Sequence, residues 1–193
     1  MEKTAQFSGL WAVILGGSSG FGFATVEKLA LHGMNVAVLY RETAAAEKLL
    51  KQKFIKIAAS NATTILSYNI NALDKDGQAI FIKEFTVQAG TQSVKLLLHS
   101  IARGNLKPLA INQTAISAAG DLVEAGDVYN VLSIDDIQLT AYAMSTSLLD
   151  WTRLLLNADL FHTDGRIIGL TSEGAHKYWE GYAAVSIAKA SLE

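Results

Sequence analysis

Short apolar runs alternate with longer amphipathic segments along this chain. The apolar runs are rich in valine, isoleucine and leucine, and each is largely apolar on both faces, as expected for a strand that helices cover above and below. We predict strands at Leu10–Leu15, Asn35–Tyr40, Thr64–Asn69, Val94–His99 and Arg166–Thr171.

Between these runs, apolar residues recur at the spacing of amphipathic helices. Strands that alternate with helices over short connections are parallel and are joined by right-handed crossovers. The pattern therefore predicts an α/β fold with a doubly wound parallel sheet and helices on both faces, in three α/β/α layers. The helices are predicted at Gly20–His32, Glu42–Lys53, Lys75–Gln88, Ile134–Leu160 and Trp179–Leu192.

No repeat, low-complexity tract or proline-rich linker divides the sequence, and its single proline is Pro108. We therefore expect one domain over residues 1–193. The stretch from Ser100 to about Ser133 has no long periodic run. A connection of this length in a compact domain is usually a functional lid, an oligomer arm or a partly disordered segment.

Composition narrows the class of protein. Of the 193 residues, 50% are hydrophobic, which is enough for a core, and 16 basic against 18 acidic residues give a net charge of −2. This balance predicts neither a nucleic-acid partner nor an anionic membrane surface. The absence of cysteine excludes disulfides and thiolate catalysis and fits the cytoplasm. No secretory signal or spanning segment is visible, and the four histidines lack metal-ligand spacing, so we expect a soluble cytoplasmic protein without a metal.

The first predicted strand runs directly into a glycine-rich turn and then a helix. At such a turn, unpaired backbone N–H groups and the positive end of the helix dipole point at one spot, which suits a pyrophosphate. Gly16 permits the tight turn, Gly20 leaves room for phosphates, and Gly22 allows close packing of helix and strand. The turn therefore predicts a dinucleotide site formed by Gly16, Ser18, Ser19, Gly20, Phe21 and Gly22.

The residues after the second predicted strand indicate which dinucleotide is bound. An acidic residue there accepts hydrogen bonds from a ribose 2′-hydroxyl, whereas an arginine pairs with a 2′-phosphate. Arg41, with the hydroxyl of Ser18 assisting, favours NADPH. NADH stays the alternative, because Glu42 would reach the ribose if the strand ended one residue later.

Tyr182 and Lys189 form a second candidate pair. Seven residues at 3.6 per turn place Lys189 almost above Tyr182 on one helix face, about 10 Å along the axis. An ammonium there can hold nicotinamide ribose hydroxyls and favour the charged form of the phenol, while the phenol donates toward a carbonyl oxygen. A tyrosine and a lysine at this spacing also occur by chance. The pair indicates a functional site only because it follows the glycine turn in the same chain.

The motifs together resemble a known family. LGGSSGFG at Leu15–Gly22 is similar to the TGxxxGxG turn of the short-chain dehydrogenase/reductases, which have the Rossmann fold. HSIA at His99–Ala102 and the Tyr-x6-Lys pair within Leu170–Glu193 resemble the enoyl-acyl-carrier-protein reductases. The resemblance covers nearly the whole chain.

The resemblance implies a reaction and its partners. The expected reaction is NADPH-dependent reduction of a trans-2-enoyl thioester in fatty-acid biosynthesis, with Tyr182 stabilising the enolate oxygen. The substrate is expected on acyl-carrier protein or CoA, and the assembly as a homotetramer through the long fifth and sixth helices. Ser100 and Ile101 are implied to lie along the nicotinamide, and Asn69 and Ile70 to border the adenine.

The sequence departs from the family in two places. Many members have a second tyrosine where this chain has Ser172; some do without it, and Tyr178 lies near enough in the sequence to be considered for its place. Carbonyl-reducing relatives use a serine there, so a 3-oxoacyl or other ketone reductase is the alternative, with Ser172 as a catalytic residue. Relatives also continue past the helix that ends this chain. We therefore expect either part of a longer protein or a truncated form, with an exposed edge at the sixth position of the sheet. A catalytically silent NADP-binding protein is the third hypothesis.

Overall fold

The computed structural model describes residues 6–110 and 131–193. They divide into two compact units. The first comprises Met1–Ile101 and Ser147–Leu170, and the second comprises Ala102–Thr146 and Thr171–Glu193. The expectation of one domain over residues 1–193 stays a prediction.

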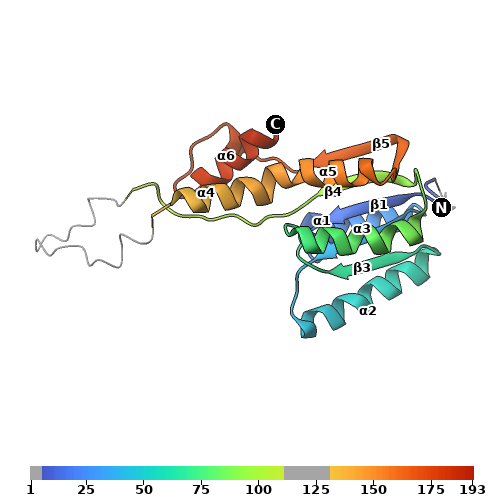
Figure 1. The fold of residues 1–193 in the computed structure, drawn as a ribbon. Helices are drawn as coiled ribbons and strands as arrows, with labels where there is room; N and C mark the ends of the chain where they lie inside the picture. Colours follow the sequence, from blue (N-terminus) through green and yellow to red (C-terminus); the bar gives the residue numbers. More distant parts are fainter. Residues whose placement is uncertain (1–5, 111–130) are drawn as a thin grey trace, which may run out of the picture. The chain divides into compact units, whose positions relative to one another are not determined.

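The first unit contains a parallel sheet of five strands (Figure 1). The strand order is β3-β2-β1-β4-β5, and every neighbouring pair is parallel. The predicted parallel sheet is therefore confirmed. Its strands are β1 at Trp11–Leu15, β2 at Asn35–Tyr40, β3 at Ile65–Asn69, β4 at Val94–His99 and β5 at Phe161–Gly169.

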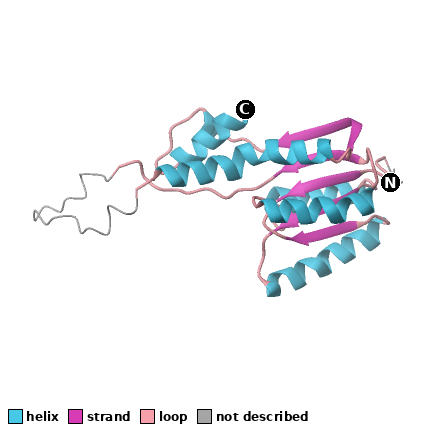
Figure 2. Cartoon of the chain, viewed as in Figure 1, coloured by secondary structure: helices cyan, strands magenta, loops and turns pink. Residues whose placement is uncertain are grey.

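Helices cover both faces of this sheet (Figure 2). One core cluster joins alternate strand residues to α1 at Gly20–Leu31 and α2 at Ala44–Asn61, and a second joins the intervening strand residues to α3 at Lys75–Ala89 and α5 at Ser147–Asn157. Side chains of a strand alternate between its faces, so the two clusters lie on opposite sides of the sheet. This arrangement confirms the three-layer, doubly wound α/β fold.

Strand β5 differs from the prediction. It begins five residues earlier than predicted and ends at Gly169, and its pairing with β4 is irregular between Val94 and Leu96. Ile167 and Ile168 are 47% and 45% exposed, so the expected cover on both faces is wrong for this strand. Within the described residues β5 has a hydrogen-bonded neighbour on one side only, which leaves an edge of the sheet.

The second unit is built mainly from two helices, α4 at Ile134–Ala141 and α6 at Ala183–Leu192, which pack on each other. Helix α4 begins with a capping box, in which the Ser133 side chain accepts from the Asp136 N–H and the Asp136 carboxylate accepts from Ser133. Lys107 also binds this carboxylate, 2.8 Å away, and these bonds lower the pKa of Asp136 to about 2. The charge network thus fixes the start of α4.

Several predicted helix bounds are wrong. The helix predicted at Ile134–Leu160 contains a π-helical segment at Tyr142–Thr146 and ends at Asn157, before Asp159 adopts a φ of 52°. The helix predicted to end at Lys53 continues to Asn61 and ends where Ala62 adopts a left-handed φ of 53°. No helix of the described part of the chain has the length and apolar character needed to cross a bilayer. Most of the long connection from 100 to 133 lies outside the described residues.

Candidate active site

The glycine turn after β1 is closely packed at both of its ends. Gly16 has a φ of 84°, and a Cβ on it would lie 2.5 Å from the carbonyl oxygen of Ser100. A Cβ on Gly22 would collide with the carbonyl oxygen of Gly16. No larger residue fits at either position, so backbone approaches backbone here as the sequence predicts.

The middle of the same turn is open. Gly20 has a φ of 53°, and a Cβ on it would have no atom within 4 Å. Ser19 is the N-cap of α1, yet its side chain makes no capping hydrogen bond. Open space beside the positive end of a helix is the arrangement that accepts a phosphate, so the residues present fit the diphosphate of a dinucleotide. Ser18 is half-buried in this turn, and Phe21 is 78% exposed.

The end of β4 lies against the glycine turn. Ser100 donates its backbone N–H to the carbonyl of Leu15 at 2.8 Å, and Ile101 follows it. Ser100 and Ile101 are therefore close to Gly16. Their expected place along the nicotinamide stays a prediction. His99, in the same segment, is buried, and its Nε2 lies 2.8 Å from the hydroxyl of Ser147.

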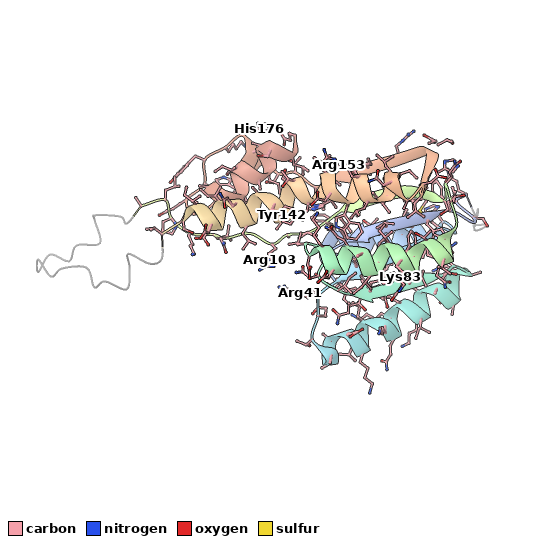
Figure 3. The ribbon with its side chains drawn as sticks, in the orientation of Figure 1. Arg41, Lys83, Arg103, Tyr142, Arg153 and His176 are labelled. Carbon is pink, nitrogen blue, oxygen red and sulfur yellow. The ribbon has the colours of Figure 1, made fainter. Side chains whose placement is uncertain are left out.

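Strand β2 ends at Tyr40, so Arg41 is the first residue beyond it (Figure 3). Arg41 is exposed and makes no ion pair with any residue that the structure describes. The next residue, Glu42, is held by the side chain of Asn69 at the end of β3. Ile70 follows and packs against the buried cluster between the sheet and α3.

Tyr182 lies at the start of α6 rather than inside a helix. The helix predicted from Trp179 begins only at Ala183, because Gly181 adopts a left-handed φ of 70°. Tyr182 is the N-cap, and its carbonyl accepts from the N–H of Ser186 at 2.9 Å. The tyrosine therefore adjoins the first turn of α6, and the seven-residue spacing to Lys189 runs along this helix.

Three residues surround the ring of Tyr182. The ring occupies the space where a Cβ on the buried Gly174 would lie, and the hydroxyl of Ser172 is 3.3 Å from that same point. The ring of Trp179 meets it edge to face, with centroids 5.2 Å apart. The Ser172 hydroxyl is buried and has no hydrogen-bond partner among the described residues. Ser172 and Tyr182 are thus brought together around Gly174.

Lys189 is the buried charged residue of α6, with 7% of its surface exposed. Burial lowers the pKa of its ammonium below the ordinary value for lysine, because desolvation disfavours the charged form. A lysine held in this environment is typical of a functional site rather than of a solvated surface. Tyr178, by contrast, is 81% exposed.

Replacing Gly174 with alanine is expected to reduce activity without unfolding the protein. The added Cβ would overlap the Tyr182 ring, which would have to move, and small displacements of a reacting group cost about 10²-fold in rate. The measurement is kcat of the variant, with thermal unfolding as the fold control. Alanine at Gly90, where a Cβ meets open space but φ is positive, is the matched control for a glycine change away from Tyr182 and from the glycine turn. Unchanged kcat in Gly174→Ala would contradict the packing argument.

The structure gives Asn69 and Gly174 contacts that the sequence did not predict. Asn69 was expected to border adenine, and its bonds to Glu42 join two segments 27 residues apart. Gly174 carried no prediction, because only the folded loop places it under the tyrosine ring. No group of three or more metal-ligating side chains occurs in residues 6–110 and 131–193.

Three comparisons with known proteins each give a result. The family model described as Enoyl-(Acyl carrier protein) reductase matches residues 16–193. A search of curated proteins finds no match. Many solved structures match over most of the chain.

Three of these structures illustrate the likeness. A Serratia marcescens short-chain dehydrogenase/reductase shares 19% identity and has a TM-score of 0.73, with 96% of this chain and 65% of that one covered. An NADPH-dependent 3-quinuclidinone reductase from Rhodotorula rubra shares 19% at a TM-score of 0.71, covering 98% and 63%. A putative D-mannonate oxidoreductase from Haemophilus influenza with bound NAD shares 20% at a TM-score of 0.75, covering 98% and 65%. This chain therefore spans less than two thirds of their lengths, and the likeness shows the fold.

Proposed function

Because this chain belongs to the short-chain dehydrogenase/reductases, within the family described as Enoyl-(Acyl carrier protein) reductase, we propose that it reduces trans-2-enoyl thioesters with NADPH. The observation that supports this most is the buried Lys189 seven residues after Tyr182 on α6. Tyr-x6-Lys is the spacing that resembles the enoyl reductases. The chain's match to their family model runs to its last residue.

The cofactor proposal rests on the glycine turn and on the end of β2. The turn at Gly16–Gly22 would hold the diphosphate, and Ser100, Ile101 and Lys189 would bind toward the nicotinamide and its ribose. Because β2 ends at Tyr40, Arg41 is the residue that would meet a 2′-phosphate, which favours NADPH over NADH. The solved relatives include one named for NADPH and one with bound NAD.

The chemistry divides between cofactor and protein. The bound dinucleotide supplies the hydride. Tyr182 donates its hydroxyl proton in a hydrogen bond to the thioester carbonyl oxygen and stabilises the charge that grows there. The ammonium of Lys189 would donate hydrogen bonds to ribose hydroxyls of the dinucleotide and so orient the nicotinamide. Trp179 and Gly174 keep the tyrosine ring in place.

A ketone reductase is the second candidate, and one observation favours it. The Ser172 hydroxyl is buried without a hydrogen-bond partner and lies beside the same glycine as the Tyr182 ring. A serine and a tyrosine that meet in this way can both donate to a ketone oxygen. The 3-quinuclidinone reductase among the solved relatives carries a name of this reaction class.

Parallel assays separate the candidates. NADPH oxidation would be followed with a crotonyl and an acetoacetyl thioester, each presented on CoA and on acyl-carrier protein. We expect turnover of the crotonyl substrate, because the Tyr-x6-Lys pair has no need of Ser172 in the enoyl reaction. Turnover of the acetoacetyl substrate alone would overturn the enoyl proposal in favour of the ketone reductase. NADPH binding without turnover of either would favour the catalytically silent protein.

Assembly and location belong to the same proposal. A homotetramer, a carrier-protein or CoA thioester partner and a cytoplasmic setting follow from the resemblance and from the composition. Sedimentation of the protein, with and without NADPH, would measure the assembly.

A further inference from the structure

The amide of Asn69 bridges two segments at the carboxyl end of the sheet. Asn69 is the last residue of β3 and pairs in register with Tyr40, the last residue of β2. Its Oδ1 accepts from the backbone N–H of Glu42 at 2.9 Å, and its Nδ2 donates to the Glu42 carbonyl at 3.0 Å. The side chain thus makes the two bonds that a paired strand residue would make, two residues beyond the end of β2.

A third bond extends this arrangement into α2. Nδ2 of Asn69 also donates to a carboxylate oxygen of Glu47 at 2.9 Å, and the other oxygen of Glu47 lies 2.7 Å from the ammonium of Lys51. The bond from Lys51, and after it the bond from Asn69, lowers the pKa of Glu47, so Glu47 accepts as a carboxylate. At the start of the same helix, Thr43 accepts from the N–H of Ala46. The segment on the carboxyl side of Arg41 is therefore held at the backbone of Glu42, at the backbone N–H of Ala46 and at the side chain of Glu47.

These bonds require an amide at residue 69. Both N–H groups of the amide are directed at acceptors, the Glu42 carbonyl and the Glu47 carboxylate. A carboxylate in the same place would still accept from the Glu42 N–H, but its other oxygen would face those two acceptors and repel them. The adenine-bordering role expected for Asn69 would have to use the one acceptor site left on Oδ1.

We propose that Asn69 is a positioning residue for cofactor selectivity: by holding the Glu42 backbone, it fixes the place from which Arg41 meets the 2′-phosphate of NADPH. The inference rests on the proposed NADPH site. It goes further by assigning selectivity to a residue that acts through Arg41 and Glu42. Arg41 carries the charge that would bind the 2′-phosphate. Asn69 fixes the backbone next to Arg41, so that Arg41 keeps one position although the loop around it is exposed.

The test compares the affinities of NADPH and NADH for the purified chain, measured by fluorescence titration. We expect Asn69→Asp to weaken NADPH binding about tenfold and NADH binding about twofold or less, because only the 2′-phosphate depends on Arg41. Arg41→Ala is the reference for complete loss of the preference. Asn69→Ser removes the bonds of the amide without adding charge, and it is also expected to weaken NADPH binding more than NADH binding. This variant provides the test if Asn69→Asp does not fold.

A second substitution distinguishes positioning from general damage. Glu47→Gln alone is expected to leave the preference unchanged, since an amide oxygen still accepts from Asn69. In the double variant Asn69→Asp with Glu47→Gln, the new amide can donate to Asp at residue 69, and we expect partial recovery of NADPH affinity. A variant that had merely lost stability would not recover in this way.

The outcomes separate the two proposals. If the wild type prefers NADPH and Asn69→Asp keeps that preference, or loses both affinities equally, the inference on Asn69 is overturned and the proposed NADPH site stands. If the wild type retains neither nucleotide, the proposed function fails and the inference fails with it. Loss of preference in Asn69→Asp with recovery in the double variant supports both.

Discussion

Replacing Tyr182 with phenylalanine is expected to lower the rate of thioester reduction by about 10²–10³-fold while NADPH affinity changes little. The phenol is the donor that would stabilise charge on the carbonyl oxygen, and phenylalanine keeps the ring. The ring's contacts with Trp179 and Gly174 involve carbon atoms, so the variant should fold as the wild type does. The measurements are kcat with the crotonyl thioester, nucleotide affinity and the melting temperature.

Tyr178→Phe is the matched control for this change. Tyr178 is 81% exposed and four residues away in sequence, so loss of its hydroxyl should leave kcat within about twofold. Undiminished activity in Tyr182→Phe would remove Tyr182 from the mechanism. Loss of activity in the Tyr178 variant instead would assign the donor role to that residue. In the ketone assay, loss of activity in Ser172→Ala would assign a donor role to the Ser172 hydroxyl.

Replacing Lys189 with methionine is expected to lower kcat/KM for thioester reduction by about 10²-fold or more. The melting temperature is not expected to fall. Methionine fills similar space but has no ammonium to bind the ribose hydroxyls of the cofactor. Burial lowers the pKa of Lys189, which means that the folded protein disfavours the ammonium relative to the unfolded chain. Removing the charge therefore removes a desolvation cost, and this gain offsets the interaction of Lys189 that the substitution also removes.

The lowered pKa of Lys189 also predicts how the stability difference between Lys189→Met and the wild type changes with pH. The pKa of Lys189 is lower in the folded state than its ordinary value of 10.5, so the charge costs stability below the folded pKa. This cost disappears as the pH rises from the folded pKa toward the unfolded one. Any stability advantage of Lys189→Met should therefore be largest near neutral pH and shrink at alkaline pH, as measured by denaturant unfolding.

Lys177→Met is the control for that experiment. Lys177 is exposed and pairs with Glu173, four residues before it in the sequence, an arrangement that contributes little to stability. Its replacement should leave both activity and melting temperature close to wild type. A clear fall in the melting temperature of Lys189→Met would contradict the interpretation of Lys189 as a buried functional charge.

The strands were predictable because their signal is local. Val36 to Tyr40 are all buried, and a strand with both faces covered shows as a continuous apolar run. The run at Arg166–Thr171 resembles the others, yet β5 starts at Phe161 and leaves Ile167 and Ile168 exposed. Burial depends on which elements lie beside a strand, and the amino-acid sequence of the strand alone does not specify those neighbours.

The glycine turn was also predictable, since its residues act through their own backbone. Gly16 and Gly20 have positive φ values, and Gly22 touches a carbonyl only six residues away. The start of α6 was not predictable to the same degree. Apolar spacing continues across Trp179 and Tyr182, but a single left-handed residue, Gly181, delays the helix to Ala183.

By itself, the sequence determined the parallel sheet, the glycine turn between β1 and α1 and the order of Arg41, Tyr182 and Lys189, because periodicity, glycine backbone freedom and residue spacing act over a few residues. Only the tertiary structure decided that Asn69 holds the backbone of Glu42 and that Ser172 and Tyr182 meet over Gly174. Those contacts arise when separate segments pack together, and a hydrogen bond or a steric contact depends on distances that no local pattern fixes.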